Sequence, residues 1–72
     1  MSRFHDWRER AGLSLQEVAD LTGVSTAMLS RIEHGKRTPS PMMRVQIARR
    51  LGVRVGELFE VDALDVDEAV GT

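Results

Sequence analysis

Apolar residues recur at steps of three and four between residues 15 and 32, which is the spacing of helices with one buried face. Gly23 divides this stretch, and a glycine there can adopt the left-handed conformation that ends a helix. The apolar positions are, in order, Leu15, Val18, Ala19 and Leu21, followed by Met28 or Leu29 and then Ile32. The pattern therefore predicts two short helices joined by a tight turn.

Polar residues at the expected helix ends support this prediction. Ser14 is followed three residues later by Glu17, which forms the Ser-x-x-Glu capping box that satisfies two backbone N–H groups at a helix start. Ser25 can cap the second helix, and Gly35 stands where that helix must end. Two helices in this arrangement have the layout of a helix-turn-helix.

The pattern in the rest of the chain predicts three more helices. The first covers about residues 3–11, the fourth runs from its cap at Ser40 to Gly52, and a short fifth covers Val55 to Phe59. We expect the fifth helix to be weak, because Arg54 at its start supplies no capping oxygen. The predicted fold is all-α, a compact bundle of about five short helices with a helix-turn-helix formed by the second and third.

The net charge of -1 hides a strong asymmetry along the chain. Residues 1–56 contain all ten Lys and Arg residues and five acids, a net charge of +5. Residues 57–72 contain the other six acids and no base, a net charge of -6. A basic head has the right sign for phosphate neutralisation on duplex DNA. Because the last predicted helix ends at Phe59, we divide the chain into a DNA-binding domain (residues 1–59) and an acidic tail (residues 60–72) for dimerisation or partner binding.

The outer side of the second predicted helix carries small polar residues and one arginine. These are Thr26, Ala27, Ser30 and Arg31, the residues that we expect to contact DNA bases. Small side chains let a helix enter a major groove about 12 Å wide, and Arg31 can bind guanine O6 and N7 bidentately. Lys36 and Arg37, in the loop that follows, are candidates for phosphate contacts. The alternatives are a solvated helix face and two cations that balance the helix dipole.

Four stretches resemble one known family: RERAGLS, EVADLTGVS, LSRIEHGKRTPSP and IARRLGVRVGELF. Residues 8–59 are similar to the helix-turn-helix domain of phage repressors and Cro proteins, the Cro/repressor-type family. This resemblance implies a five-helix, lambda-repressor-like fold and dimeric DNA binding, with Ala27, Ser30 and Arg31 facing bases. It also implies an ion pair between Arg8 and Glu33.

The phosphate contacts we expect come from two helix starts and one loop. They are Ser14, Gln16, Ser25, Lys36, Arg37 and Thr38. The sequence departs from the family at Leu15, where a phosphate-binding Gln is common; Gln16 points about 100° away from that position. It departs again at Arg44, where an aliphatic residue is common, so we expect Met43 or Val45 to fill the core instead.

Several classes of function are not expected from the composition. The lack of cysteine excludes a disulfide framework and favours a reducing cytoplasm. No apolar run approaches the roughly 18–20 residues that span a bilayer, so we expect no membrane partner. His5 and His34 have no His or Cys partner at metal-ligand spacing. We expect no metal, no cofactor and no enzymatic activity.

The sequence thus predicts a cytoplasmic, sequence-specific regulator of transcription that binds a double-stranded operator with inverted repeats as a homodimer. Repression by covering a promoter is the simplest mechanism, and activation through RNA polymerase is equally compatible. The expected dimer surface is the fifth helix with the tail, namely Leu58, Phe59, Val61 and Leu64. The alternative is an antitoxin or adaptor of the same fold, whose acidic tail binds a protein partner.

Overall fold

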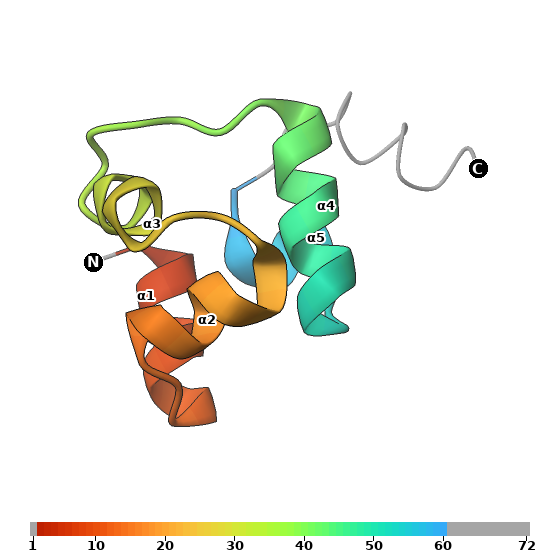
Figure 1. Cartoon of the computed structure of the whole chain (residues 1–72). Helices are drawn as coiled ribbons and strands as arrows, with labels where there is room; N and C mark the ends of the chain where they lie inside the picture. The colour runs from red at the N-terminus through yellow and green to blue at the C-terminus, as the bar shows by residue number, and fades with distance from the viewer. Residues whose placement is uncertain (1, 61–72) are drawn as a thin grey trace.

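The computed structural model describes residues 2–60, and this part of the chain contains five α-helices and no strand (Figure 1). The helices are α1 (Arg3–Ala11), α2 (Leu15–Thr22), α3 (Thr26–Glu33), α4 (Pro41–Leu51) and α5 (Val55–Leu58). The predicted all-α fold of five short helices is therefore confirmed.

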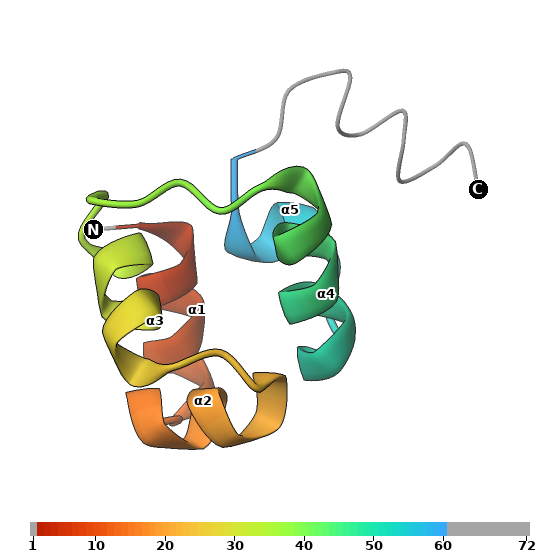
Figure 2. The same cartoon turned by 45° about the horizontal axis from the view of Figure 1, so that its top comes forward.

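The helices form two groups, which are connected by α2 and by a direct contact between α1 and α5. In Figure 2, α1 and α3 lie on one side, α4 and α5 lie on the other, and α2 runs across below them. α2 packs against both α3 and α4, while α1 packs against α3 and α5. The helix-turn-helix is thus supported from behind by α1 and from one end by α4.

Serine side chains begin four of the five helices. In each case the hydroxyl oxygen accepts a hydrogen bond from the backbone N–H three residues later, which is otherwise without a partner at a helix start. The serines are Ser2, Ser14, Ser25 and Ser40, and the donors are His5, Glu17, Met28 and Met43. At Ser14 the Glu17 carboxylate also accepts from the Ser14 N–H, at 2.8 Å, which completes the capping box.

Two glycines set the ends of the helix-turn-helix. Gly23 ends α2 with φ of 78°, and its N–H donates to Ala19 O at 2.8 Å. Gly35 follows α3 with φ of 73°. Its N–H donates to Ile32 O, and the Lys36 N–H donates to Arg31 O at 2.8 Å. Because side-chain-bearing residues rarely adopt these angles, both ends require glycine.

The hydrophobic core collects side chains from all five helices. Its buried members are Phe4, Val18, Leu29, Ile32, Ile47, Ala48, Leu58 and Phe59. The rings of Phe4 and Phe59 pack in a tilted arrangement with their centroids 6.0 Å apart. This contact joins the start of α1 to the segment that follows α5.

The expectation that Leu21 faces inward is wrong, because Leu21 is 50% exposed and Thr22 is buried instead. The Thr22 hydroxyl donates to Val18 O at 2.8 Å and accepts from the Val24 N–H at 3.2 Å. A buried threonine is tolerated here because both bonds satisfy its oxygen, and the second bond holds the turn.

On α4, the side chain of Met43 packs against the core, whereas Val45 is 38% exposed. Of the two residues expected to replace an aliphatic side chain at position 44, Met43 therefore takes that role. Arg44 itself is half-buried at the edge of the core.

The start of α5 has only part of a cap. The Glu57 carboxylate accepts from the Arg54 N–H at 2.8 Å, but the Arg54 side chain forms no capping bond. A guanidinium contains donors only, so it cannot accept from the first-turn N–H groups.

Replacing Arg54 by serine is therefore expected to raise the free energy of unfolding by about 0.5–1 kcal/mol. Urea denaturation followed by circular dichroism measures this change. Arg54→Ala, which removes the same charge without adding a cap, serves as the control. Equal gains in the two variants would contradict the capping explanation.

Candidate nucleic-acid interface

The second helix of the pair, α3, has one buried and one uncovered side. Leu29 and Ile32 are 0% and 5% exposed, and they fix the helix against the core. On the opposite side, Ala27 and Arg31 are exposed, and Thr26 and Ser30 are half-buried. Figure 2 shows α3 in front of α1, with no helix over the side that faces the viewer. The four residues predicted to contact bases thus lie along the uncovered part of one helix.

Two serines predicted to contact phosphates are already engaged as caps. The oxygen of Ser14 accepts from the Glu17 N–H at 3.0 Å, and that of Ser25 accepts from the Met28 N–H at 3.1 Å. A hydroxyl that accepts one bond still has its proton to donate. Each serine can therefore cap its helix and donate to an anion at the same time.

Gln16 is held by a neighbour on its own helix. Its Nε2 donates to Asp20 Oδ1 at 2.9 Å, and both residues are exposed. A phosphate would have to displace this bond beside a carboxylate of the same charge sign. The shift of glutamine from position 15 to 16 thus leaves it in a poor setting for a phosphate.

The loop after α3 places cations next to the uncovered side. Lys36, Arg37 and Thr38 are all exposed, and Pro39 behind them is buried. The hydrogen bond from the Lys36 N–H to Arg31 O fixes where the loop leaves the helix. This bond keeps the backbone of Lys36, at the start of the loop, next to the backbone of Arg31.

The five acidic residues of positions 1–56 all contact groups other than Arg31, Lys36 and Arg37. Glu17 belongs to the capping box, Asp20 binds Gln16, and Glu33 binds Arg8. Asp6 and Glu9 lie beside His5 on α1, 3.6 and 3.4 Å from its ring nitrogens. Within residues 2–60, no carboxylate pairs with Arg31, Lys36 or Arg37. These three cations therefore carry uncompensated positive charge.

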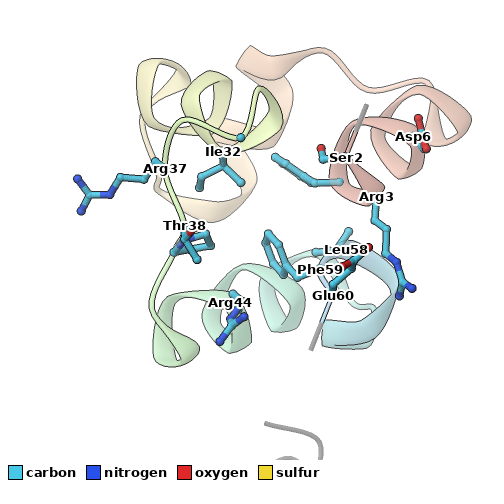
Figure 3. A pocket seen from close by; sticks show the side chains of 13 residues that line it. Ser2, Arg3, Asp6, Ile32, Arg37, Thr38, Arg44, Leu58, Phe59 and Glu60 are labelled. Atoms are coloured by element: carbon cyan, nitrogen blue, oxygen red, sulfur yellow. The ribbon is translucent and has the colours of Figure 1, made fainter. Parts of the chain in front are cut away.

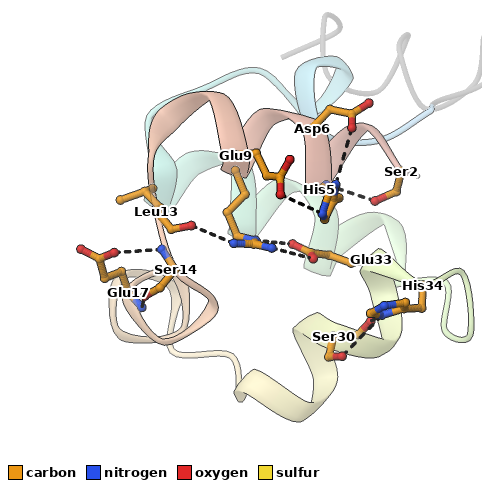
Figure 4. Close-up of polar contacts among 11 residues, drawn as sticks. Ser2, His5, Asp6, Glu9, Leu13, Ser14, Glu17, Ser30, Glu33 and His34 are labelled. Atoms are coloured by element: carbon orange, nitrogen blue, oxygen red, sulfur yellow. Dashed lines mark hydrogen bonds and ion pairs between the residues drawn. The ribbon is translucent and has the colours of Figure 1, made fainter.

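The ion pair between Arg8 and Glu33 is present in the structure and ties α1 to the end of α3 (Figure 4). Arg8 Nε lies 2.6 Å from Glu33 Oε2, and Nη2 lies 3.1 Å from Oε1. Nη1 donates to Leu13 O at 2.8 Å. The hydrogen bond to Glu33 raises the pKa of Arg8 above its ordinary value, so the guanidinium stays charged. One side chain thus joins α1, the loop before α2, and α3.

A contact that the sequence did not reveal lies on the last turn of α3. His34 Nδ1 is 2.7 Å from Ser30 O and 3.5 Å from the Ser30 hydroxyl (Figure 4). The spacing of four residues on a helix is the available signal for such a pair. The His34 ring therefore lies against Ser30, which is itself half-buried.

The expected dimer surface needs correction. Leu58 is 1% exposed and Phe59 is 8% exposed, because both fill the core between α1, α4 and α5. They are therefore not surface residues of the single chain. Val61 and Leu64, the other two members of the expected surface, lie outside the described residues.

The described residues contain no helix that is long and apolar enough to cross a membrane. In the same part of the chain, no group of three or more His, Cys, Asp or Glu side chains is arranged to hold a metal ion.

Three relatives share this region of the chain. An uncharacterized HTH-type transcriptional regulator of Mycobacterium tuberculosis is 40% identical over 52 residues, which cover 72% of this chain and 37% of the relative. The HTH-type transcriptional regulator SlrR of Bacillus subtilis is 33% identical over 66 residues, covering 90% of this chain and 43% of SlrR. An uncharacterized HTH-type transcriptional regulator of Archaeoglobus fulgidus is 31% identical over 61 residues, covering 85% of this chain and 87% of the relative.

The chain spans less than half the length of the mycobacterial and Bacillus relatives. None of the solved structures compared with it gives a significant match. A family model described as helix-turn-helix matches residues 4–58, which is nearly the whole span of the five helices. The chain therefore belongs to the helix-turn-helix family of the Cro/repressor type.

Proposed function

We propose that this chain is a sequence-specific, double-stranded DNA-binding regulator of transcription that acts as a homodimer on an inverted-repeat operator. One observation supports this proposal most strongly. The uncovered side of α3 carries Arg31 beside Lys36 and Arg37, and no carboxylate of residues 2–60 pairs with them. Uncompensated cations along one narrow helix suit a polyanion with a groove.

The proposed docking follows from the sizes of the side chains on α3. Thr26 and Ala27 on its first turn are small enough for that turn to lie deep in the major groove. There the Thr26 hydroxyl can bond a base edge, and the Ala27 methyl group can contact a thymine methyl group. Arg31, one turn later, can reach guanine O6 and N7, and Ser30 lies beside it.

Phosphate contacts would fix the position of α3 in the groove. The hydroxyl protons of Ser14 and Ser25 can be donated to phosphates while their oxygens cap the helices. Lys36 and Arg37 would contact phosphates from the loop, together with Thr38. These contacts supply affinity that falls steeply with salt and is independent of sequence.

The homodimer is proposed because one recognition helix reads few base pairs. Two copies related by a two-fold axis would read half-sites about 34 Å apart. Occupying a promoter in this way would repress transcription. Sedimentation of the full chain at tens of micromolar, free and with operator DNA, tests the dimer, and a monomer under both conditions would contradict it.

Selection from a randomised duplex pool at about 0.15 M salt tests DNA recognition. The wild type is expected to enrich an inverted repeat. Arg31→Ala is expected to lose preference at one base per half-site, at a cost of about 1–3 kcal/mol for each.

Arg50→Ala, which removes an exposed arginine of α4, is the matched control and should select the wild-type site. No enrichment by any of these proteins would contradict the proposal. That result would favour the antitoxin or adaptor hypothesis, in which removal of residues 60–72 abolishes binding to a protein partner.

A further inference from the structure

A groove of about 330 Å³ lies between the start of α1, the loop from α3 to α4, and the end of α5 (Figure 3). Ile32, Leu58 and Phe59 point into its centre, and Arg3 and Arg44 flank it from opposite sides. It shares Arg37 and Thr38, in the loop after α3, with the candidate nucleic-acid interface. Its volume is at the low end for ligand sites, about enough for a few side chains.

The groove combines an apolar floor with positively charged edges. Arg3 Nη1 donates to Gly56 O at 2.9 Å, which leaves its other N–H donors to face an anion. Three arginines and two acids line the groove: Arg3, Arg37, Arg44, Asp6 and Glu60. Figure 3 shows the Arg37 and Asp6 side chains extending away from it, and the remaining Arg3, Arg44 and Glu60 have a net charge of about +1, so a segment that alternates apolar and acidic residues suits it best.

The chain itself supplies such a segment directly after the groove. Glu60 lines the groove, and the sequence continues as VDALDVDEAVGT. Acids occupy positions 62, 65, 67 and 68, apolar residues occupy positions 61, 64 and 66, and no base is present. Four residues span at most about 14 Å, so Leu64 is within reach of the groove.

We propose that residues 61–68 dock in this groove of their own chain. Val61 and Leu64 would cover Phe59, and the acids would face Arg3 and Arg44. The connection through Glu60 makes the contact intramolecular, with an effective concentration in the millimolar range, so even a weak contact is occupied.

The loop after α3 couples this groove to the uncovered side of α3. Thr38 lines the groove, while the Arg37 side chain extends away from it (Figure 3). Acids docked behind the loop would lower the positive potential in front of it and weaken DNA binding. This consequence depends on the proposed function, whereas the docking itself does not.

Two variants of the full chain distinguish docking of the tail from a long-range effect of its negative charge. The neutral-tail variant contains Asp62→Asn, Asp65→Asn, Asp67→Asn and Glu68→Gln. The polar-tail variant contains Val61→Ser, Leu64→Ser and Val66→Ser, and it keeps every charge. In ¹⁵N NMR spectra both are expected to shift the amides of Arg3 and Thr38, which are remote in sequence from the tail. The amide of Asp20 on α2 should not move, and Arg50→Gln should leave all three unchanged.

Three NMR results would overturn the proposal. One is the absence of any shift in both tail variants. Another is a shift in the neutral-tail variant alone, which would indicate attraction at a distance without docking. The third is dependence of the wild-type shifts on protein concentration, which would indicate that the tail of a second copy occupies the groove.

Binding to a random-sequence duplex tests the consequence for DNA. At about 0.05 M salt both tail variants are expected to bind roughly three- to tenfold more tightly than the wild type, and the difference should vanish near 0.5 M. A gain by the neutral-tail variant alone would overturn the coupling through docking. If no protein bound DNA while both tail variants shifted Arg3 and Thr38, the proposed function would fail and the docking would stand.

Discussion

Replacing Glu33 by alanine is expected to lower the free energy of unfolding by about 3–5 kcal/mol. The Glu33 side chain is 2% exposed, and its carboxylate accepts two hydrogen bonds from Arg8, which is itself 15% exposed. Removing it leaves a poorly solvated guanidinium whose remaining hydrogen bond is the one to Leu13 O. The substitution also removes a negative charge from the C-terminal end of α3, where the helix dipole disfavours it. This gain in stability is about 0.3–1 kcal/mol, which is too small to offset the loss.

Urea denaturation followed by circular dichroism measures this loss. A chain of this size has a net stability of about 3–5 kcal/mol, so the variant should be largely unfolded in buffer. Asp20→Ala, which removes an exposed carboxylate from α2, is the control and should change stability by less than about 0.5 kcal/mol. A Glu33→Ala protein as stable as this control would show that the ion pair contributes nothing net.

Replacing Phe59 by alanine is expected to lower the free energy of unfolding by about 3–5 kcal/mol as well. The ring is 8% exposed and packs against Phe4, so its removal leaves a cavity between α1 and α5. A residue that served only at a dimer surface would behave differently. Its replacement would change the sedimentation of the chain and leave the stability of each copy intact.

Denaturation and sedimentation on the same Phe59→Ala sample separate these roles. Met42→Ala is the matched control, because Met42 is a large apolar residue that is 79% exposed. It should unfold at the wild-type urea concentration. A Phe59→Ala protein with wild-type stability and altered sedimentation would reinstate Phe59 as an interface residue.

The helix boundaries could be predicted because they depend on local chemistry. Ser14 and Ser25 accept bonds from backbone groups three residues away, and Gly23 ends α2 through its own conformation. None of these interactions needs a partner from elsewhere in the chain. The same holds for α1, whose predicted range of about 3–11 agrees with the helix observed.

The direction in which single side chains point was less predictable. Leu21 and Thr22 are neighbours on α2, and the packing of α2 against two other helices decides which of them is buried. Leu58 ends a helix of one turn and Phe59 follows it, and so short an element has no periodic pattern that distinguishes core from surface.

In the candidate site, too, some features could be predicted from the sequence and others could not. The uncovered positions Ala27 and Arg31 follow from helical spacing. The bond between Gln16 and Asp20 lies at a common helical spacing, but the sequence alone does not say whether Gln16 prefers Asp20 or a phosphate.

The bond between Arg8 and Glu33 also restricts how this sequence can change over time. Arg8 and Glu33, 25 residues apart, neutralise each other's charge inside the protein. A substitution at either position alone therefore loses stability, and a paired substitution avoids this loss. A well-packed apolar pair of similar volume can replace a buried ion pair at little cost. Among natural descendants of this chain, we therefore expect residues 8 and 33 to be exchanged together, as a coupled pair.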